Sequence, residues 1–419
     1  MRGGEGHEAR VAVAGAVPGS EAVDVVVVGG GIIGLAIAWT VARAGPSVRV
    51  FDPAPARGAT FAAAGMLAPV SEYHYQEDAL LELMVASAER YPAFVEALAP
   101  GRIAAGYLPT ETLLVGVDQG DRRALADLHA AHRARRLVAD PISLAGLRTL
   151  EPCLGPRVTS GYRVCGDHQV DPRLLAKRLL AGLESAPAAG IVPERVVTLL
   201  HSDPADSGSR VVGVRGERGT TVTAAEVVLA NGLGASGVGA LPRGLLLPLR
   251  PVFGDILRLR VPDRLRPLLT ATVRAFVRGE SVYLVPRADG TLVIGATQRE
   301  DGLAGVSAAG VHRLLRDAQE VLPAVAELEF LEATARARPA TPDNAPLLGR
   351  VRIGDGDLPG LIVATGFFRH GVLLAPIAAE ICLGLIERLP DDERWKGFRP
   401  DRFAPQDAAL AAAERNTIR

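Results

Sequence analysis

Residues 23–52 read VDVVVVGGGIIGLAIAWTVARAGPSVRVFD, and this stretch decides the fold. It opens with a nearly continuous apolar run, which is typical of a parallel strand buried on both faces. Residues 32–44 then predict a helix, because Gly45 suits the position after a helix and Pro46 cannot continue one. Residues 47–52 predict a second strand. A strand, a crossover helix and a parallel strand make one βαβ unit.

The glycines between the first strand and the helix satisfy the pattern GxGxxG. Gly29 permits a tight turn, Gly31 lets the backbone approach a pyrophosphate, and Gly34 lets helix and strand pack closely. The helix N-terminus offers free N–H groups and a positive dipole end. Asp52, 18 residues after Gly34, is placed to accept hydrogen bonds from ribose hydroxyls. The combination predicts a dinucleotide site but does not choose between NAD and FAD.

Composition excludes several classes of function. The 419 residues carry 46 basic and 47 acidic side chains, so the formal charge of −1 leaves no electrostatic footprint for nucleic acid. Residues 25–42 are uncharged, yet the glycines split this run into a strand and a helix, so we predict no membrane span. The three cysteines have no metal-ligand spacing, and their odd number argues against a disulfide framework. Residues 1–22 make a poor signal peptide, and we expect a cytoplasmic protein.

Two histidines on a predicted helix raise the question of a metal site. His129 and His132 lie three positions apart on a predicted helix, a spacing that permits a shared metal ion. No third ligand is evident nearby in the sequence. We therefore expect both side chains to face solvent and predict no metal site.

The remaining pattern predicts an α/β molecule with two domains. Helices are expected at 77–99, 121–136, 172–183, 308–322 and 371–389. Closely spaced strands at 255–260, 272–277, 281–286 and 291–296 predict an antiparallel sheet. We expect a Rossmann-like nucleotide-binding domain with an inserted antiparallel substrate domain. The expected divisions are a flexible extension 1–22, a discontinuous nucleotide-binding domain 23–75, 160–240 and 335–390, a substrate-binding domain 76–159 and 241–334, and a C-terminal tail 391–419.

Four segments carry a resemblance to a known family. They are residues 25–45, residues 58–72 (GATFAAAGMLAPVSE), residues 281–300 (SVYLVPRADGTLVIGATQRE), and the pair 335–349 (ARARPATPDNAPLLG) and 364–376 (ATGFFRHGVLLAP). In their order and residue content these segments resemble the D-amino-acid oxidase superfamily of FAD-dependent oxidoreductases, and within it the glycine oxidases of thiamine thiazole synthesis. The resemblance implies FAD as the cofactor. No cysteine lies between Pro339 and His370, so we expect the flavin to be bound noncovalently.

The resemblance also implies which residues hold the cofactor. The ADP half would be held around the glycine loop, the isoalloxazine beside the alanine-rich run, and the adenine near one further backbone segment. The last group would enter the final helix and offer helix-terminal N–H groups at the pyrimidine side of the flavin. In chain order these residues are Gly29, Gly31, Ile32, Ile33, Gly34 and Asp52; Ala63, Ala64, Gly65 and Met66; Val196; Ala230 and Gly232; and Gly366, His370, Gly371, Val372 and Leu373.

Three residues match the substrate site of that family. Arg338 corresponds to the carboxylate-binding arginine, Tyr283 to its hydroxyl partner, and Arg369 to a second positive position. A rigid guanidinium suits a carboxylate because it donates two parallel hydrogen bonds. Without the resemblance, a solvent-facing arginine and a core tyrosine are the plainer interpretations.

The implied activity is oxidation of glycine, and of sarcosine or small D-amino acids, to glyoxylate or the imine, ammonia and H₂O₂. Thiazole synthase is the implied partner, and a homo-oligomer is expected. A sarcosine oxidase, a D-amino-acid oxidase or dehydrogenase, and a noncatalytic flavin-binding scaffold stay open as alternatives. The family often has His-Tyr-Arg-Asn-Gly where residues 367–371 read FFRHG, and Gln298 falls where relatives line the pocket, so substrate preference is the least determined property.

Overall fold

The computed structural model describes residues 20–353, 356–390 and 392–403. Its N-terminal unit is the predicted βαβ arrangement of β1 (Glu21–Val28), α1 (Ile32–Ala44) and β2 (Val48–Phe51). The two strands pair in parallel. Gly45 ends the helix in the left-handed region at φ 116°, as predicted, and its N–H donates to the Ala42 carbonyl. The expected extension at 1–22 lies largely outside the described residues.

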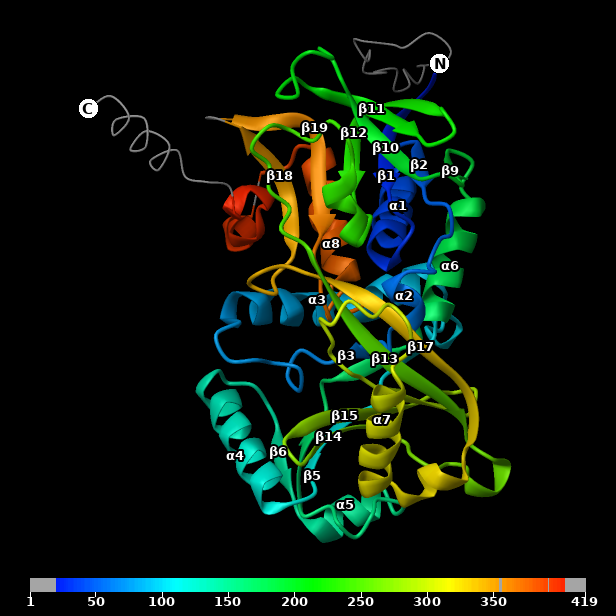
Figure 1. Ribbon diagram of the computed structural model, residues 1–419, viewed down its shortest axis with the longest axis vertical. Coiled ribbons are helices and arrows are strands. Elements are labelled where there is room, and N and C mark those ends of the chain that lie inside the picture. The colour runs from blue at the N-terminus through cyan, green and yellow to red at the C-terminus, as the bar shows by residue number, and fades with distance from the viewer. Residues whose placement is uncertain (1–19, 354–355, 391, 404–419) are drawn as a thin grey trace, which may run out of the picture.

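The first sheet is parallel from β9 to β12 and β19, and β10, β11 and β18 add antiparallel pairs. Its central order is β9-β2-β1-β12, and β12 also pairs in parallel with β19. Helices α1, α3, α6 and α8 pack together against this part of the molecule, with α1 between α6 and α8 (Figure 1). The bounds are β9 (Ala189–Val192), β10 (Val196–His201), β11 (Val211–Gly216), β12 (Thr221–Leu229), β18 (Leu347–Ile353), β19 (Gly356–Thr365), α3 (Asp78–Leu98), α6 (Pro172–Glu184) and α8 (Ala375–Ile386).

The second sheet is the predicted antiparallel one, with a single exception. Its order is β17-β13-β16-β15-β14-β5-β7-β6. All pairs are antiparallel except β5 with β14, which run in parallel. The bounds are β5 (Thr112–Gly116), β6 (Asp140–Ile142), β7 (Ser160–Val164), β13 (Arg250–Arg260), β14 (Thr272–Val277), β15 (Glu280–Pro286), β16 (Thr291–Gly295), β17 (Glu329–Ala340), α4 (Gln119–Ala134), α5 (Leu144–Leu150) and α7 (Ala308–Val321).

Short elements lie between the two sheets. A small sheet has the order β3-β8-β4, and the four-residue helix α2 precedes it. Long strands β13 and β17 extend from the second sheet toward this junction (Figure 1). The bounds are α2 (Ala59–Ala62), β3 (Met66–Leu67), β4 (Tyr107–Leu108) and β8 (His168–Val170), with 3-10 turns at Ile103–Ala105, Gly232–Gly237, Asp263–Leu265, Pro323–Glu327, Glu393–Phe398 and Pro400–Phe403.

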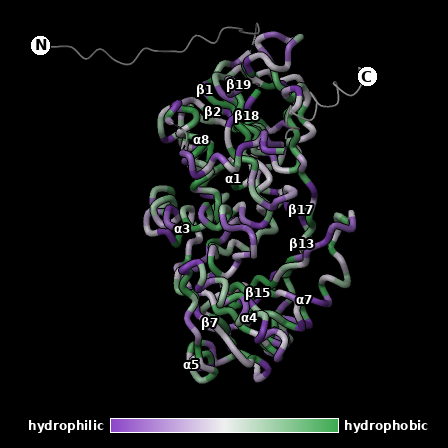
Figure 2. The backbone as a smooth tube through the Cα atoms, turned by 90° about the vertical axis from the view of Figure 1, so that its left-hand side faces the viewer, coloured by the Kyte–Doolittle hydropathy of each residue, from purple (hydrophilic) through white to green (hydrophobic). Residues whose placement is uncertain are grey.

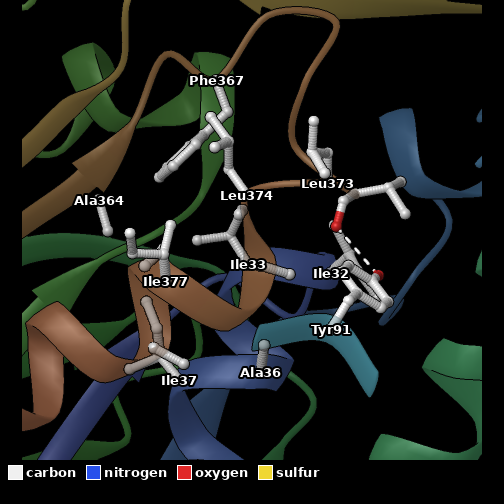
Figure 3. Packing of buried hydrophobic residues seen from close by; sticks show 14 of the residues in the cluster. Ile32, Ile33, Ala36, Ile37, Tyr91, Ala364, Phe367, Leu373, Leu374 and Ile377 are labelled. Atoms are coloured by element: carbon white, nitrogen blue, oxygen red, sulfur yellow. Dashed lines mark hydrogen bonds between the residues drawn. The ribbon is translucent and has the colours of Figure 1, made fainter. Parts of the chain in front are cut away.

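The largest hydrophobic cluster joins α1 to the chain that enters α8. Figure 3 shows side chains of α1 facing those of the later segment, while the Tyr91 hydroxyl donates to the Val372 carbonyl at 3.1 Å. Hydrophobic stretches are present in both parts of the molecule (Figure 2). Trp395 and Phe398, in the segment expected to be a tail, are buried in the same cluster. The labelled core residues are Ile32, Ile33, Ala36, Ile37, Ala364, Phe367, Leu373, Leu374 and Ile377.

Two predictions of detail are wrong, and one strand was missed. The last helix begins at Ala375 rather than at residue 371, because residues 371–374 form turns. Strand β18 was not foreseen. His132 is fully buried against Tyr73 instead of facing solvent, because this face of α4 packs on the loop that contains Tyr73. In the described part of the chain, none of the helices is both long and apolar enough to cross a membrane.

The expected division into domains stays a prediction, and several elements bear on it. Helix α3 contributes to the core of the first sheet through its contacts with α8, although residues 76–159 were assigned to substrate binding. Strand β7 pairs with β5 in the second sheet, although it begins the expected segment 160–240.

Candidate active site

A cavity of about 730 Å³ lies where the two sheets meet. Its walls come from the β1–α1 loop, the α2–β3 segment and the loop of residues 71–75, together with β14, β15 and β17. The turn of residues 364–372 closes another side. The cavity therefore brings together segments from all four regions that carried the sequence resemblance.

The glycine loop has the geometry that its pattern predicts. Gly29 adopts φ 106°, and a Cβ on Gly34 would lie 1.9 Å from the Gly29 carbonyl oxygen, so only glycine fits there. A Cβ on Gly31 would meet nothing nearer than the Thr60 hydroxyl at 3.7 Å, so this face is open to the cavity. The Ile32 N–H donates to that hydroxyl at 2.9 Å. A phosphate group fits this open backbone at the start of a helix.

Asp52 lines the same end of the cavity. Its two carboxylate oxygens accept the N–H groups of Gly30 and Ala54, each at 2.7 Å. Each carboxylate oxygen has a second lone pair, so the side chain can hold the loop and still accept a hydroxyl. The loop and Asp52 together fit the ribose and pyrophosphate of a dinucleotide.

Most of the other predicted cofactor residues line the cavity. Ala63, Ala64, Gly65 and Met66 line one wall, and Gly65 requires its φ of 71° and lack of a side chain because a Cβ would lie 2.0 Å from the Val170 carbonyl oxygen. The remaining lining residues from the prediction are Ile32, Ile33, Ala230, Gly232, Gly366, Gly371 and Val372.

Four predicted cofactor residues lie behind the lining. Gly34 supports the loop from inside, while Val196 and Leu373 are buried in separate hydrophobic clusters. His370 is 1% exposed and stands behind Arg369. Because α8 starts only at Ala375, the expected helix-terminal N–H groups at residues 366–373 belong to turns instead.

Arg338 and Tyr283 come together on the second sheet, each lying across a glycine. A Cβ on Gly254 would be 2.2 Å from Arg338 Nη1, and a Cβ on Gly295 would be 2.4 Å from the Tyr283 hydroxyl. Arg338 Nη1 donates to the Thr297 carbonyl at 3.3 Å. The two glycines were not identified from the sequence, where each reads as an ordinary strand residue; only the pairing of strands reveals what lies above them.

Burial raises the pKa of Tyr283, and the nearby positive charge of Arg338 opposes that rise. The phenol therefore stays neutral at physiological pH and can donate its proton in a hydrogen bond. A guanidinium and a neutral hydroxyl on one wall of the cavity are groups that can donate hydrogen bonds to a carboxylate.

Arg369 is also in the cavity wall, but it is already paired. Its Nη2 donates to Glu77 at 2.8 Å, and its Nε donates to His370 Nε2 at 2.9 Å. Burial lowers the pKa of Arg369, with Glu72 and Glu77 opposing the shift. The pKa of His370 lies well below its usual value because the ring is buried and Arg369 is adjacent. His370 is thus a neutral hydrogen-bond acceptor for Arg369.

A second ion pair in the cavity wall joins Arg274 to Glu72. His74 lies in the same wall, and burial lowers its pKa to about 4. The sequence reasoning missed Glu72, Glu77 and Arg274. The cluster of charges directly after the alanine-rich run, in residues 71–78, was the available signal. Among the described residues there is no group of three or more side chains suited to a metal ion.

Comparisons with known proteins agree with this geometry. The model of the family described as "DAO: FAD dependent oxidoreductase" matches residues 24–385. The chain is 32% identical over 388 residues to the bifunctional protein ThiO/ThiG of Trichormus variabilis, covering 91% of this chain but only 55% of that protein. The chain thus spans about half the length of this relative.

Shorter relatives match over nearly their whole length. The glycine oxidase of Geobacillus kaustophilus is 31% identical over 377 residues, which cover 87% of this chain and 93% of that protein. A crystal structure of glycine oxidase from the same organism superposes with a TM-score of 0.80 at 29% identity, over 92% of this chain and 100% of that one. The glycine loop and the cavity agree with these matches. This chain belongs to the DAO family of FAD-dependent oxidoreductases.

Proposed function

We propose that this chain oxidises glycine, and with it sarcosine or small D-amino acids, in a reaction that depends on FAD. One observation carries the choice of a small monocarboxylic substrate. Four arginines line the cavity, and one of them, Arg336, is exposed to solvent and donates to the backbone carbonyls of Arg57 and Ala335. Of the other three, Arg274 and Arg369 are each paired with a glutamate, whereas the described contacts give Arg338 no carboxylate partner. Among the less exposed cavity arginines, Arg338 is therefore the one guanidinium that is not neutralised, and it matches one substrate carboxylate.

The residues of the chain act mainly by binding and orientation. Arg338 would hold the carboxylate, and Tyr283 would donate its hydroxyl proton to the same group, so the α-carbon is fixed by two contacts. Arg369 stays engaged with Glu77 and His370 and shapes the positive side of the wall. Bound FAD supplies the chemistry of accepting a hydride and of returning electrons to O₂.

The cofactor residues follow from the lining of the cavity. We propose that Gly29, Gly31 and Asp52 hold the ADP half, with the first turn of α1, and that residues 63–66 face the isoalloxazine. None of the three cysteines, all within the described residues, lines the cavity, which supports noncovalent binding. The proposed role of Val196 at the adenine has no such support.

An anaerobic spectrum tests the assignment. Purified protein loaded with FAD is mixed with glycine, sarcosine or D-alanine, and the loss of flavin absorbance is followed. We expect glycine to reduce the flavin and air to restore the spectrum with release of H₂O₂. Reduction by larger D-amino acids alone would favour a D-amino-acid oxidase or dehydrogenase, and bound flavin that no amine reduces would favour a noncatalytic scaffold.

Arg338→Ala is the matched variant for this assay. Removing a charge-assisted bidentate contact costs on the order of 3 kcal/mol in transition-state binding, or about a hundredfold in kcat/KM. Arg336→Ala serves as control, because Arg336 also lines the cavity but donates to the backbone carbonyls of Arg57 and Ala335. An unchanged kcat/KM in Arg338→Ala would refute the carboxylate assignment.

We also propose a partner for the reaction product. A relative that joins ThiO to ThiG in one protein, of which this chain spans 55%, supports thiazole synthase as a partner that receives the imine product. We also propose a cytoplasmic homo-oligomer. Co-purification with a thiazole synthase and a thiamine requirement in a deletion strain are the expected results, and a deletion strain that grows without thiamine would count against this role.

A further inference from the structure

Arginine side chains bind the backbone that joins α2 to β3. Arg258 Nη2 donates to the carbonyl oxygens of Phe61 and Ala63, at 3.3 Å each. Arg287 Nη2 donates to the carbonyl oxygen of Ala64. Neither arginine lines the cavity, so these carbonyl groups point away from it. Arg258 and Arg287 are together called the carbonyl clamp.

The next carbonyl group is held in the same direction. The Val170 N–H donates to the Gly65 carbonyl at 2.8 Å, and Val170 likewise lies outside the lining. In a trans peptide the N–H and C=O groups point in opposite directions. The N–H groups of Ala64 and Gly65, which follow the clamped carbonyls of Ala63 and Ala64, therefore point toward the cavity that these residues line.

The clamp also places positive charge behind this wall. Arg258 is 8% exposed, and its Nη1 lies 3.0 Å from Glu332 Oε1. Glu332 also forms an ion pair with Arg173. Arg287 has only uncharged partners among the described residues: Gln169 Oε1 at 2.8 Å, the Val170 carbonyl at 3.0 Å and the Ala64 carbonyl.

Arg287 remains a cation under working conditions. Burial lowers its pKa to about 10, which still leaves the guanidinium protonated at neutral pH. Its charge acts across a partly desolvated wall, where electrostatic interactions are stronger than in water.

We propose that Arg258 and Arg287 are positioning residues that turn the donor side of the residue 63–66 backbone toward the flavin and, with their charge, favour the reduced cofactor. Reduction adds negative charge, so fixed donors and a nearby cation bind the reduced form more tightly than the oxidised form. The inference rests on the FAD dependence of the family and is independent of which amine is oxidised.

The test measures the two-electron midpoint potential of the bound flavin by dye equilibration during chemical reduction, without any amine substrate. The variants are Arg287→Met, which removes the charge and the donors, and Arg287→Lys, which keeps the charge. Arg266→Met is the matched control, since Arg266 Nε donates to the Val261 carbonyl at 2.9 Å away from the cavity. The affinity for FAD is measured alongside by fluorescence titration of the apoprotein.

We expect Arg287→Met to weaken binding of reduced FAD about tenfold more than binding of oxidised FAD. This ratio lowers the two-electron potential by about 30 mV. Arg287→Lys should lie between Arg287→Met and the wild type, and Arg266→Met should keep the wild-type potential. If Arg287→Met does not fold, Arg258→Met should lower the potential in the same direction.

A merely structural role gives a different result. If the foldable clamp variant binds both flavin forms more weakly by the same factor, or keeps a potential within about 10 mV of the wild type, the proposal is overturned. Wild-type protein that takes up no FAD would overturn the cofactor assignment itself, whereas wild type that binds FAD but is not reduced by glycine would affect only the proposed substrate.

Discussion

Gly254→Ala tests whether the position of Arg338 is set by the bare backbone beneath it. An alanine Cβ would lie 2.2 Å from Arg338 Nη1, 2.4 Å from Nη2 and 2.5 Å from Cζ. Nonbonded heavy atoms settle at about 3.5–4.0 Å, so the guanidinium must move by about 1 Å or more. That shift takes it out of hydrogen-bonding range of a carboxylate held in the original position.

The size of the effect follows from the contact that is lost. A hydrogen bond to a charged group contributes about 1.5–3 kcal/mol, and each 1.36 kcal/mol is a factor of ten in rate. We therefore expect kcat/KM for glycine to fall about 10- to 100-fold. The backbone itself tolerates alanine, because Gly254 does not adopt a positive φ.

Steady-state kinetics and a double-mutant cycle decide the question. In an Arg338→Ala background, Gly254→Ala should cost little more, because the displaced side chain is already absent. Gly216→Ala, in β11, is the control: its Cβ would lie 2.2 Å from Glu194 Oε2, and neither residue lines the cavity. Equal losses in kcat/KM with and without Arg338 would refute the reasoning, and would mean that the methyl group acts only by occupying space.

Three further predictions concern the fold and the cavity. Gly34→Ala should lower the unfolding free energy by about 1–3 kcal/mol, because its Cβ would lie 1.9 Å from the Gly29 carbonyl oxygen. Gly31→Ala should keep the melting temperature of the apoprotein and weaken FAD binding at least about tenfold. Equal melting temperatures for the two variants would contradict this difference. Burial raises the pKa of Asp167 from 3.8 to about 6, so the native state binds the proton more tightly, and this group's contribution to stability falls as pH rises from about 4 to 6. Asp167→Asn should therefore gain stability relative to wild type across that range, by up to about 3 kcal/mol in denaturant titrations, and a pH-independent difference would exclude this cause. Glu77→Gln leaves Arg369 without its carboxylate, so kcat/KM for D-aspartate relative to glycine should rise, and an unchanged ratio would argue against pairing as the determinant of monocarboxylate preference.

Local signals in the sequence were sufficient for the nucleotide-binding part of the molecule. The strand, glycine loop and helix of residues 23–45 are contiguous, and the steric reason for Gly34 lies within the motif, since its Cβ would meet the Gly29 carbonyl oxygen at 1.9 Å. Gly29 differs, because a Cβ there would meet Ala230 and Asn231 at the end of β12. The helix expected at 172–183 was likewise confirmed: α6 begins at Pro172, and the Asp171 side chain caps it by accepting the Arg173 and Leu174 N–H groups. Such features are decided within a few residues, so the sequence predicts them well.

The start of the last helix shows where local signals end. Residues 371–374 have helix-compatible composition, yet they form turns, and two side chains of α3 hold their carbonyl groups: Tyr91 donates to Val372 and Ser87 donates to Leu373. His132 was predicted to face solvent and is buried by the loop that packs on α4. In both cases a segment distant in the sequence overrides local preference.

The sequence by itself determined the family and the cofactor class, because these depend on residue types in a recognisable order. The substrate roles of Arg338, Tyr283 and Arg369 stay predictions, and the structure places all three in the cavity wall. Only the tertiary structure decided which of the cavity arginines have a carboxylate partner. Arg369 meets Glu77 and Arg274 meets Glu72 across separations of 292 and 202 residues. Charge neutralisation at such pairs is a property of distances in space, and no spacing along the chain encodes those distances.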